Sequence, residues 1–306
     1  MKFSPAYEKL EYAPEVPTNL INSKVGVDTN ENAGEYQLNL FDKKVFNFPK
    51  PVSLIKYLLG FLDNDTEDFI VLDFFSGSAT TAEAVMQLNY EKPTSKRKYI
   101  MVQIAEDLYR SLAAASSKSQ KEIIQNAIDL LTTLKRPVNL CELGKERIRR
   151  AGKKIKEENK DKEAIDRLDT GFRVLKLDSS NMADVYYTPA QTPIEQTLGF
   201  EAFEDNIKPD RTAEDLLFQV MPECNLPLSS RIEEREIHGK KVYAVDGNYL
   251  VACFDRDIDE QVITEIARMQ PYYFVMRDAS AATDNVLDNF DQIFNAYSKE
   301  TIRRIL

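Results

Sequence analysis

The spacing of apolar residues predicts an amphipathic helix directly after Pro51. Leu54, Tyr57 and Leu58 stand at positions i, i+3 and i+4, and the same period continues to residue 62. This period places the apolar side chains on one face of a helix. Proline is favoured in the first turn because the N–H that it lacks has no helical partner there. We therefore expect this face to pack against a core.

A strand, a helix and a second strand are predicted between residues 69 and 104. Residues 69–75 (FIVLDFF) form a short, mostly apolar run with β-branched residues, which is typical of a strand buried on both faces in a parallel sheet. Small residues follow, and residues 80–88 (TTAEAVMQL) favour a helix. Residues 99–104 (YIMVQI) begin roughly thirty residues after the first run, the repeat length of a βαβ unit with a right-handed crossover. The fold class is therefore α/β.

Two further helices are predicted at residues 119–134 and 139–156, on either side of Arg136-Pro137. The start of the chain differs from this part, because residues 1–41 show little periodicity and contain several turn formers: Pro14, Pro17, Asn30, Asn32 and Gly34. We expect residues 1–41 to be an extended lead-in segment or the tail of a missing module, and residues 42–170 to form the first domain.

A second, smaller domain of the α+β class is predicted at residues 171–306. Residues 172–177 (FRVLKL) alternate like a half-buried strand, and residues 231–254 contain apolar runs separated by Gly-containing turns, which predicts an antiparallel meander. A helix at 258–269 and a buried strand at 272–276 (YYFVM) follow.

Composition narrows the class of protein. The three cysteines, Cys141, Cys224 and Cys253, are widely spaced and form no CxxC pair, so neither a disulfide framework nor a zinc cluster is predicted. The N-terminal residues lack a signal pattern, and no stretch approaches the ~18 apolar residues of a membrane-spanning helix. We expect a cytoplasmic protein without a membrane segment.

Charge is unevenly distributed along the chain. The formal net charge of −10 argues against a protein that mostly coats nucleic acid. Residues 145–156 (KERIRRAGKKIK) nevertheless hold seven basic residues and one acidic residue. Two hypotheses stay open for this run: it contacts phosphate, or it is the solvated face of a helix.

The candidate chemistry lies at the end of the first apolar run. Small residues after a strand let backbone N–H groups and a helix N-terminus face a ligand, and Asp73 adds a carboxylate beside them. This pattern favours a nucleotide-like cofactor with a cationic amino group. Neither GxxxxGK[ST] nor GxGxxG occurs here, and Asp73 would repel a pyrophosphate. The alternative is an ordinary strand-to-helix turn.

The residues around Asp73 also resemble a known family. D-x-F-x-G-S-x-T-T, at 73–81, is similar to the S-adenosylmethionine motif of amino-methylating DNA methyltransferases, and residues 47–51 (NFPKP) resemble the Lys-Pro motif that precedes it in the permuted, or beta, group. Further segments resemble the methylation (Mod) subunits of type III restriction-modification systems: 16–41, 98–106 (KYIMVQIAE), 139–152 (NLCELGKERIRRAG), 171–182 (GFRVLKLDSSNM) and 246–254 (DGNYLVACF). The resemblance covers nearly the whole chain from Pro14 onward.

The resemblance implies a partial Rossmann-like methyltransferase sheet that binds S-adenosyl-L-methionine. The residues implied to line the cofactor pocket are Lys50, Pro51, Asp73, Phe74, Phe75, Ser76, Gly77, Ser78 and Thr80. Gln103 and Glu106 are alternative partners for the ribose hydroxyls. Ala79 stands where this family commonly has a third glycine, and its methyl group is expected to fit while weakening the closest backbone contact.

The catalytic motif of the family is missing from this chain. Methylation of the adenine N6 amine needs a [DNS]-P-P-[YFW] loop that grips the amine and stacks on the flipped base. The nearest string, Ser4-Pro5-Ala6-Tyr7, lacks the second proline. We therefore expect no catalytic residue here, and a chain that is inactive without a missing N-terminal methyltransferase half.

The resemblance also implies partners and an alternative function. The expected partners are the missing half, a second copy in a homodimer, the restriction (Res) subunit and, through the full assembly, DNA. The alternative is a noncatalytic assembly or dimerisation module, or a remnant of a Mod subunit. An unrelated small-molecule methyltransferase is a third hypothesis, but the acidic second domain offers no cluster of substrate residues.

Other polar residues carry weaker hypotheses. His238, the only histidine, stands in a predicted hairpin turn, so we interpret it as structural. The serine pairs at 179–180 and 229–230 have no histidine paired with them, so no nucleophilic triad is predicted. Asp255, Asp257 and Asp259 alternate, but the glycine and glutamate of a calcium loop are absent. Pro209-Asp210 is not followed by a spaced ExK, so neither a nuclease nor any metal site is predicted.

Overall fold

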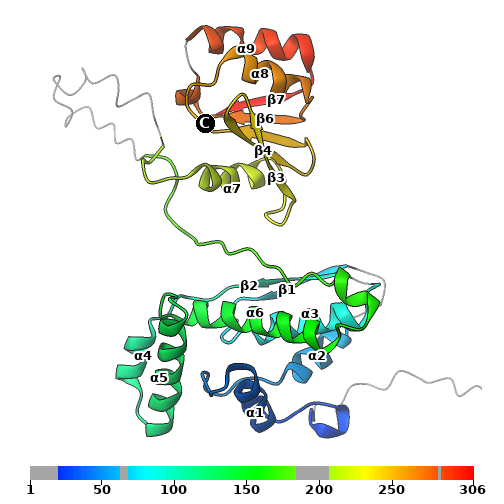
Figure 1. Cartoon of the computed structure of the whole chain (residues 1–306), viewed down its shortest axis with the longest axis vertical. Coiled ribbons are helices and arrows are strands. Elements are labelled where there is room, and N and C mark those ends of the chain that lie inside the picture. Colours follow the sequence, from blue (N-terminus) through cyan, green and yellow to red (C-terminus); the bar gives the residue numbers. More distant parts are fainter. Residues whose placement is uncertain (1–19, 63–67, 95, 184–206, 282–283) are drawn as a thin grey trace, which may run out of the picture. The chain divides into compact units, whose positions relative to one another are not determined.

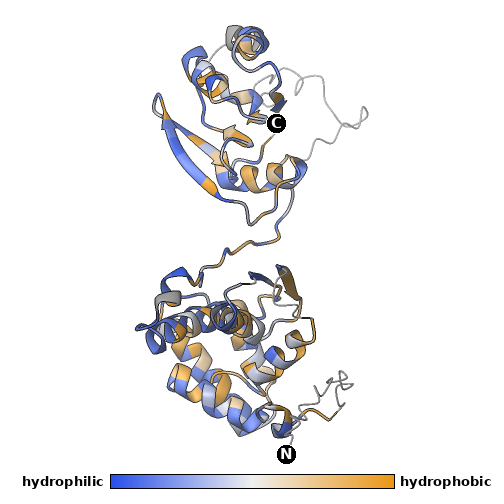
Figure 2. Cartoon of the chain, turned by 90° about the vertical axis from the view of Figure 1, so that its right-hand side faces the viewer, coloured by the Kyte–Doolittle hydropathy of each residue, from blue (hydrophilic) through white to orange (hydrophobic). Residues whose placement is uncertain are grey.

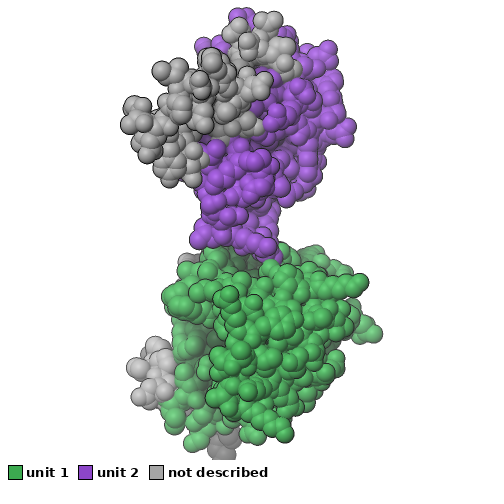
Figure 3. Space-filling model, turned by 90° about the vertical axis from the view of Figure 1, so that its left-hand side faces the viewer, with its two compact units in different colours: residues 1–172 green, residues 173–306 purple. Residues whose placement is uncertain are grey.

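The computed structural model of the chain describes residues 20–62, 68–94, 96–183, 207–281 and 284–306. These residues belong to two compact units, Met1–Phe172 and Arg173–Leu306, shown in green and purple in Figure 3. The described residues form a mixed α/β structure with two separate sheets, one in each unit.

The predicted βαβ unit forms the centre of unit 1. Strands β1 (Phe69–Asp73) and β2 (Arg97–Met101) pair in parallel, with Phe69 opposite Arg97 and Asp73 opposite Met101. Helix α3 (Thr80–Glu91) joins them and is almost entirely buried, because it packs against both the sheet and the next layer of helices. The prediction of a parallel pair joined by a helix is confirmed.

The prediction that the first of these strands is buried on both faces is wrong for the described residues. Side chains along β1 alternate, and Ile70 and Leu72 are 62% and 59% exposed. Ile100 on β2 and Val102 just after it are 49% and 48% exposed. Only the opposite face, with Tyr99 and Met101, contacts the core of α3 and α6. The apolar run therefore leaves one open apolar face.

Helices surround the covered face of this sheet (Figure 1). Helix α2 follows Pro51 as predicted, although it buries no residue fully. Two of the predicted helices correspond to α5 and α6, whereas the short α4 was not predicted. The bounds are η1 (Ser23–Val25), α1 (Asn30–Phe41), α2 (Val52–Gly60), α4 (Leu108–Ala114), α5 (Lys118–Thr133), α6 (Leu140–Glu158) and η2 (Glu163–Arg167).

Helix α1 corrects the prediction of an extended lead-in for residues 30–41, whereas residues 1–19 of that segment lie outside the described residues. The Thr29 hydroxyl caps it by accepting the Asn32 N–H, so one of the predicted turn formers instead takes part in a helix start. Leu40 and Phe41 are buried in a core shared with α5 and α6. Tertiary packing of this face outweighs the low helix propensity of its Asn and Gly residues.

Most of the basic residues of α6 contact carboxylates. Six of the seven form ion pairs. Arg147 pairs with Glu83 on α3, and the other five have a partner on α6 itself: Lys145–Glu142, Arg149–Glu146, Arg150–Glu146, Lys153–Glu157 and Lys154–Glu158. Pairs three or four residues apart on a helix stabilise it modestly. This arrangement favours a self-neutralised helix face over a surface that contacts phosphate.

Two glycines on α6 give a matched test of its packing. A Cβ atom added at Gly152 would lie 2.9 Å from the Thr170 Cβ, whereas one at Gly144 would first meet the Gly77 carbonyl oxygen at 3.5 Å. Alanine gains about 1 kcal/mol over glycine inside a helix. We expect Gly144→Ala to leave stability unchanged or raised, and Gly152→Ala to lower it by about 1–3 kcal/mol through overpacking. Urea unfolding of both variants checks this; equal effects would contradict the packing of Thr170 on α6.

Unit 2 contains a mixed five-stranded sheet with the strand order β3-β4-β5-β6-β7. The first three strands are antiparallel, as the meander prediction required, and β5, β6 and β7 run parallel. The bounds are α7 (Ala213–Glu223), β3 (Ile232–Ile237), β4 (Lys240–Val245), β5 (Leu250–Cys253), α8 (Glu260–Arg268), β6 (Tyr273–Met276), η5 (Asp278–Ser280), α9 (Asp284–Tyr297) and β7 (Ile302–Ile305).

Two apolar cores sandwich this sheet. Helix α7 packs on one face with Leu217 and Tyr243, and helices α8 and α9 pack on the other with Ile263 and Phe274 (Figures 1 and 2). The predicted strand at 172–177 is wrong: these residues form no strand, and the Leu177 side chain is fully exposed. Alternation alone did not reveal that the segment has no pairing partner among the described residues.

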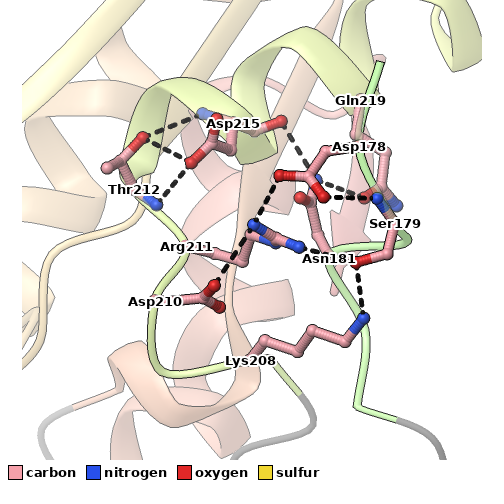
Figure 4. Close-up of polar contacts among 9 residues, drawn as sticks. All are labelled: Asp178, Ser179, Asn181, Lys208, Asp210, Arg211, Thr212, Asp215 and Gln219. Atoms are coloured by element: carbon pink, nitrogen blue, oxygen red, sulfur yellow. Dashed lines mark hydrogen bonds and ion pairs between the residues drawn. The ribbon is translucent and has the colours of Figure 1, made fainter. Parts of the chain in front are cut away.

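The first turn of α7 yields a pH-dependent prediction. Thr212 and Asp215 form a capping box in which the Asp215 carboxylate accepts the Thr212 N–H at 2.8 Å (Figure 4). That backbone hydrogen bond, followed by the Thr212 hydroxyl, lowers the pKa of Asp215. Asp215→Ala should therefore cost about 1 kcal/mol at neutral pH.

The loss of stability caused by Asp215→Ala should be smaller at low pH. Because the pKa is lowered in the folded state, the carboxylate contributes its full stability above its unfolded pKa, near ~3.9, and loses it as the pH falls through the folded value. Thermal unfolding between neutral pH and about pH 2.5 measures this. Glu214→Ala is the control, since it removes an acidic residue from the same turn and leaves the capping box. A pH-independent cost would contradict the charge-assisted cap.

Candidate cofactor site

A cavity of about 430 Å³ lies at the carboxyl end of β1. The turn between β1 and α3 forms one wall, and the segment before α2 forms another. Side chains of α5 and α6 complete it. Ligands of parallel α/β sheets bind at this end of the strands, because helix N-termini and loops meet there.

Eight of the eleven predicted cofactor residues line this cavity: Lys50, Asp73, Phe75, Ser76, Gly77, Ser78, Thr80 and Glu106. The other three lie elsewhere. Pro51 lines an adjoining cavity of about 610 Å³ between α1, α2 and α3, and Phe74 points to solvent. Gln103 supports the turn from β2 by accepting the Gly77 N–H. Of the two alternative ribose partners, Glu106 is the one beside the cavity.

The turn has a left-handed backbone at two positions. Gly77 has φ 48° and Ala79 has φ 59°, and the Ala79 N–H donates to the Ser76 carbonyl at 2.7 Å. Gly77 is favoured there because it has no Cβ to clash. Ala79 accepts the same conformation while its methyl group is buried near Gly144. Ala79 therefore fits into the turn, but its left-handed backbone retains some strain.

The turn is fixed to the end of β2 by hydrogen bonds. The Ser76 N–H donates to the Val102 carbonyl at 3.2 Å, and the Gly77 N–H donates to the Gln103 side-chain oxygen at 2.8 Å. These bonds set the orientation of the first turn of α3 relative to the sheet. The polar wall of the cavity is thus preorganised by the βαβ unit itself.

Charges of both signs surround the cavity. The Asp73 carboxylate accepts the Thr81 hydroxyl at 2.6 Å, and the Glu106 carboxylate accepts the Ser111 hydroxyl at 2.6 Å. Opposite in sign are the Lys50 ammonium and the N-terminus of α3, whose unpaired N–H groups carry partial positive charge. Such a site suits a zwitterionic ligand more than a polyanion.

The remaining wall is apolar and was not predicted. It consists of Val45, Phe46, Leu108, Ile123, Ile124, Ala127, Leu140 and Leu143. The buried Gln37 side chain of α1 holds this wall by accepting the N–H groups of Val45 and Phe46 at 2.6 and 2.8 Å. An apolar wall beside a few polar groups is typical of sites for planar, drug-sized ligands.

A buried ion pair lies beneath the turn and was also missed. Glu83 on α3 is fully buried, and Arg147 on α6 is 4% exposed. The Arg147 Nε donates to the Glu83 Oε2 at 3.0 Å, and its Nη1 donates to the hydroxyls of Ser78 and Thr80 at 2.9 and 2.7 Å. The position of Arg147 in the sequence could have indicated this buried charge, because it falls on the apolar stripe of α6 between Leu143 and Ala151.

The phenol of Tyr36 completes this buried network. Its hydroxyl donates to the second carboxylate oxygen of Glu83. Burial, together with the adjoining Glu83 carboxylate, raises the pKa of Tyr36 well above its ordinary value, so the phenol stays protonated. The network thereby links α1, α3 and α6 to the turn.

A second polar cluster, in unit 2, connects two segments of the chain (Figure 4). The Arg211 guanidinium lies 3.2 Å from Asp178 and 3.5 Å from Asp210, and donates to the Ser179 hydroxyl at 2.8 Å. The Ser179 N–H and then Arg211 hold the pKa of Asp178 below its ordinary value. Together with the Lys208 N–H to Asn181 carbonyl bond, the cluster ties two segments of the chain together.

The described residues contain no group of three or more His, Cys, Asp or Glu that is placed to hold a metal ion. Of the three alternating aspartates considered for a calcium loop, Asp255 accepts the Lys241 N–H and Asp259 caps α8. His238 occupies the turn between β3 and β4, as its structural interpretation predicted. Within the same residues, no helix has both the length and the apolar character to cross a membrane.

Comparison with known proteins confirms the family resemblance. Residues 9–115 match the family described as DNA methylase. The chain is 35% identical over 133 residues to the Mod subunit of the type III restriction-modification enzyme StyLTI of Salmonella typhimurium, an alignment of 44% of this chain and 17% of the relative.

Two further Mod subunits are similar. That of EcoPI from Escherichia phage P1 is 38% identical over 99 residues, or 29% of this chain and 15% of the relative. That of EcoP15I from Escherichia coli is 29% identical over 210 residues, or 68% of this chain and 26% of the relative. The chain thus spans about a quarter or less of each relative that it matches.

Proposed function

We propose that unit 1 of this type III Mod-related chain binds S-adenosyl-L-methionine in the cavity at the end of β1, as part of an adenine-specific DNA methyltransferase. The observation that carries the proposal is that eight predicted cofactor residues, separated in sequence by up to 56 positions between Lys50 and Glu106, line one cavity. When bound, this cofactor supplies the methyl group for transfer to an amino nitrogen.

Each part of the cavity matches a part of this cofactor. The apolar wall that includes Phe46 and Ile124 suits the adenine, and the Glu106 carboxylate suits the ribose hydroxyls. Asp73 is the acceptor for the ammonium group, while the N-terminus of α3 favours the carboxylate. Because two carboxylates border the cavity, a polyphosphate nucleotide is disfavoured.

We assign catalysis to polypeptide outside these 306 residues, since they contain no [DNS]-P-P-[YFW] motif. The open apolar face formed by Ile70, Leu72, Ile100 and Val102 is a surface for that part to cover. In the described residues β1 also has an unpaired edge, where a further strand can extend the sheet into a Rossmann-like one. We infer that the same polypeptide pairs with this edge of β1. DNA and a restriction subunit are the proposed partners of the full assembly.

The competing function is a noncatalytic assembly module in which the cavity is vestigial. Isothermal titration of the purified chain with S-adenosylmethionine separates the two, with ATP as the polyphosphate control. The proposal predicts saturable binding at one site and no measurable ATP binding. A folded chain that fails to bind S-adenosylmethionine would favour the assembly module or remnant, and equal affinity for ATP would contradict the proposed charge complementarity.

A further inference from the structure

We infer that Arg147 is a positioning residue for the cofactor site: it orients the hydroxyls of Ser78 and Thr80 so that one O–H faces the cavity and donates to the carboxylate of the ligand's methionine head group. The inference rests on the proposed function, because it assigns a role toward the same ligand. Arg147 itself lies behind the turn and does not line the cavity.

The hydrogen-bond donors of Arg147 are divided between two tasks. Its Nε and Nη2 both lie 3.0 Å from the Glu83 Oε2, so these atoms complete the buried ion pair. Its Nη1 is left for the turn, where it donates to the hydroxyl oxygens of Ser78 and Thr80. The fixed fork of a guanidinium makes this division possible, whereas the single ammonium of lysine does not reproduce it.

The hydroxyl protons follow from this division. A guanidinium has no acceptor, so the oxygens of Ser78 and Thr80 must both accept from Arg147. The two hydroxyls are 3.0 Å apart, and either one can donate to the other. One O–H then remains that neither Arg147 nor the other hydroxyl can accept. Both residues line the cavity, so that proton is available to an acceptor of the ligand.

The electrostatic setting selects an anionic acceptor. The buried guanidinium polarises both hydroxyls toward donation, and the N-terminus of α3 adds partial positive charge at Thr80. The Asp73 carboxylate is occupied by the Thr81 hydroxyl rather than by this pair. Of the polar groups of S-adenosylmethionine, the carboxylate is the one that this end of the cavity favours.

The test compares two ligands that differ only in this group: S-adenosylmethionine and its decarboxylated form. Single replacement of Arg147 endangers folding, so the main variant is Glu83→Gln with Arg147→Met, which removes both buried charges. Ser78→Ala with Thr80→Val is a second variant that leaves the ion pair intact. Lys153→Met, on the exposed side of α6, is the matched control. Affinities are measured by titration of each folded protein.

We expect both double variants to lose about tenfold or more in affinity for S-adenosylmethionine and to change little toward the decarboxylated ligand. Equal losses toward both ligands would show a merely structural role and overturn the inference, as would unchanged affinities. In either case wild-type binding would leave the proposed function standing. A wild-type chain that binds neither ligand would instead overturn the proposed function, and the inference with it.

Discussion

Arg147→Met alone is expected to lower the free energy of unfolding of unit 1 by about 3–5 kcal/mol, because it leaves the fully buried Glu83 carboxylate without a cation. Tyr36 and Gln87 would still donate to Glu83, but neutral donors do not compensate a charge in a buried position. The hydroxyls of Ser78 and Thr80 would lose a donor at the same time.

Glu83→Gln combined with Arg147→Met should cost far less than Arg147→Met alone. Removal of both charges eliminates the desolvation penalty together with the attraction, so such double replacements are often nearly neutral. Hydrogen exchange of the α3 amides in urea measures the effect in unit 1 without a contribution from unit 2. Lys153→Met is the control on the same helix, with an expected change within about 0.5 kcal/mol. Additive losses in the double variant would contradict a coupled pair.

Asp73→Asn is expected to weaken S-adenosylmethionine binding by at least about tenfold. The substitution keeps the shape and an oxygen that can accept the Thr81 hydroxyl, but it removes the negative charge beside the cavity. Hydrogen bonds to charged groups contribute about 1.5–3 kcal/mol, which corresponds to roughly ten- to a hundredfold in affinity.

Titration calorimetry measures this loss, with Asp129→Asn as the control for charge alone. Asp129 is an exposed aspartate on α5 that pairs with Gln125 and does not line the cavity. Its replacement should change the affinity less than about twofold. Unchanged binding by Asp73→Asn would show that the carboxylate does not meet the cofactor's ammonium group.

The βαβ unit could be predicted because its sequence signals are local. A β-branched apolar run, small residues at the turn and a helical repeat fix β1, the turn and α3 without reference to the rest of the chain. The same holds for the meander, whose Gly-containing turns and apolar runs set β3, β4 and β5. For these elements, local propensity and tertiary packing favour the same structure.

Elements that depend on distant contacts could not be predicted. Helix α1 contains Asn30, Asn32 and Gly34, and it is held by the burial of Leu40 and Phe41 against helices far along the chain. The prediction for residues 172–177 is wrong in the opposite sense: their alternation predicted a strand, but they have no pairing partner in the described residues. Pairing partners cannot be read from one segment.

The candidate site was predicted in part for the same reason. Residues of the motif itself, such as Asp73 and Ser78, lie together at the cavity because one turn carries them. Glu83 and Arg147 are separated by 64 positions, and only the packing of α3 on α6 brings them together. The burial of a charged residue on an apolar stripe is a usable signal, because such a residue requires a partner of opposite charge.

A crystal structure of the chain with S-adenosylmethionine would show whether the cavity at the end of β1 is the cofactor site. We expect the cofactor in this cavity, with its adenine against Phe46 and Ile124, its ribose near Glu106 and its methionine head group between Asp73 and Thr80. A cofactor bound elsewhere, or the reverse orientation with the adenine at Asp73, would contradict it.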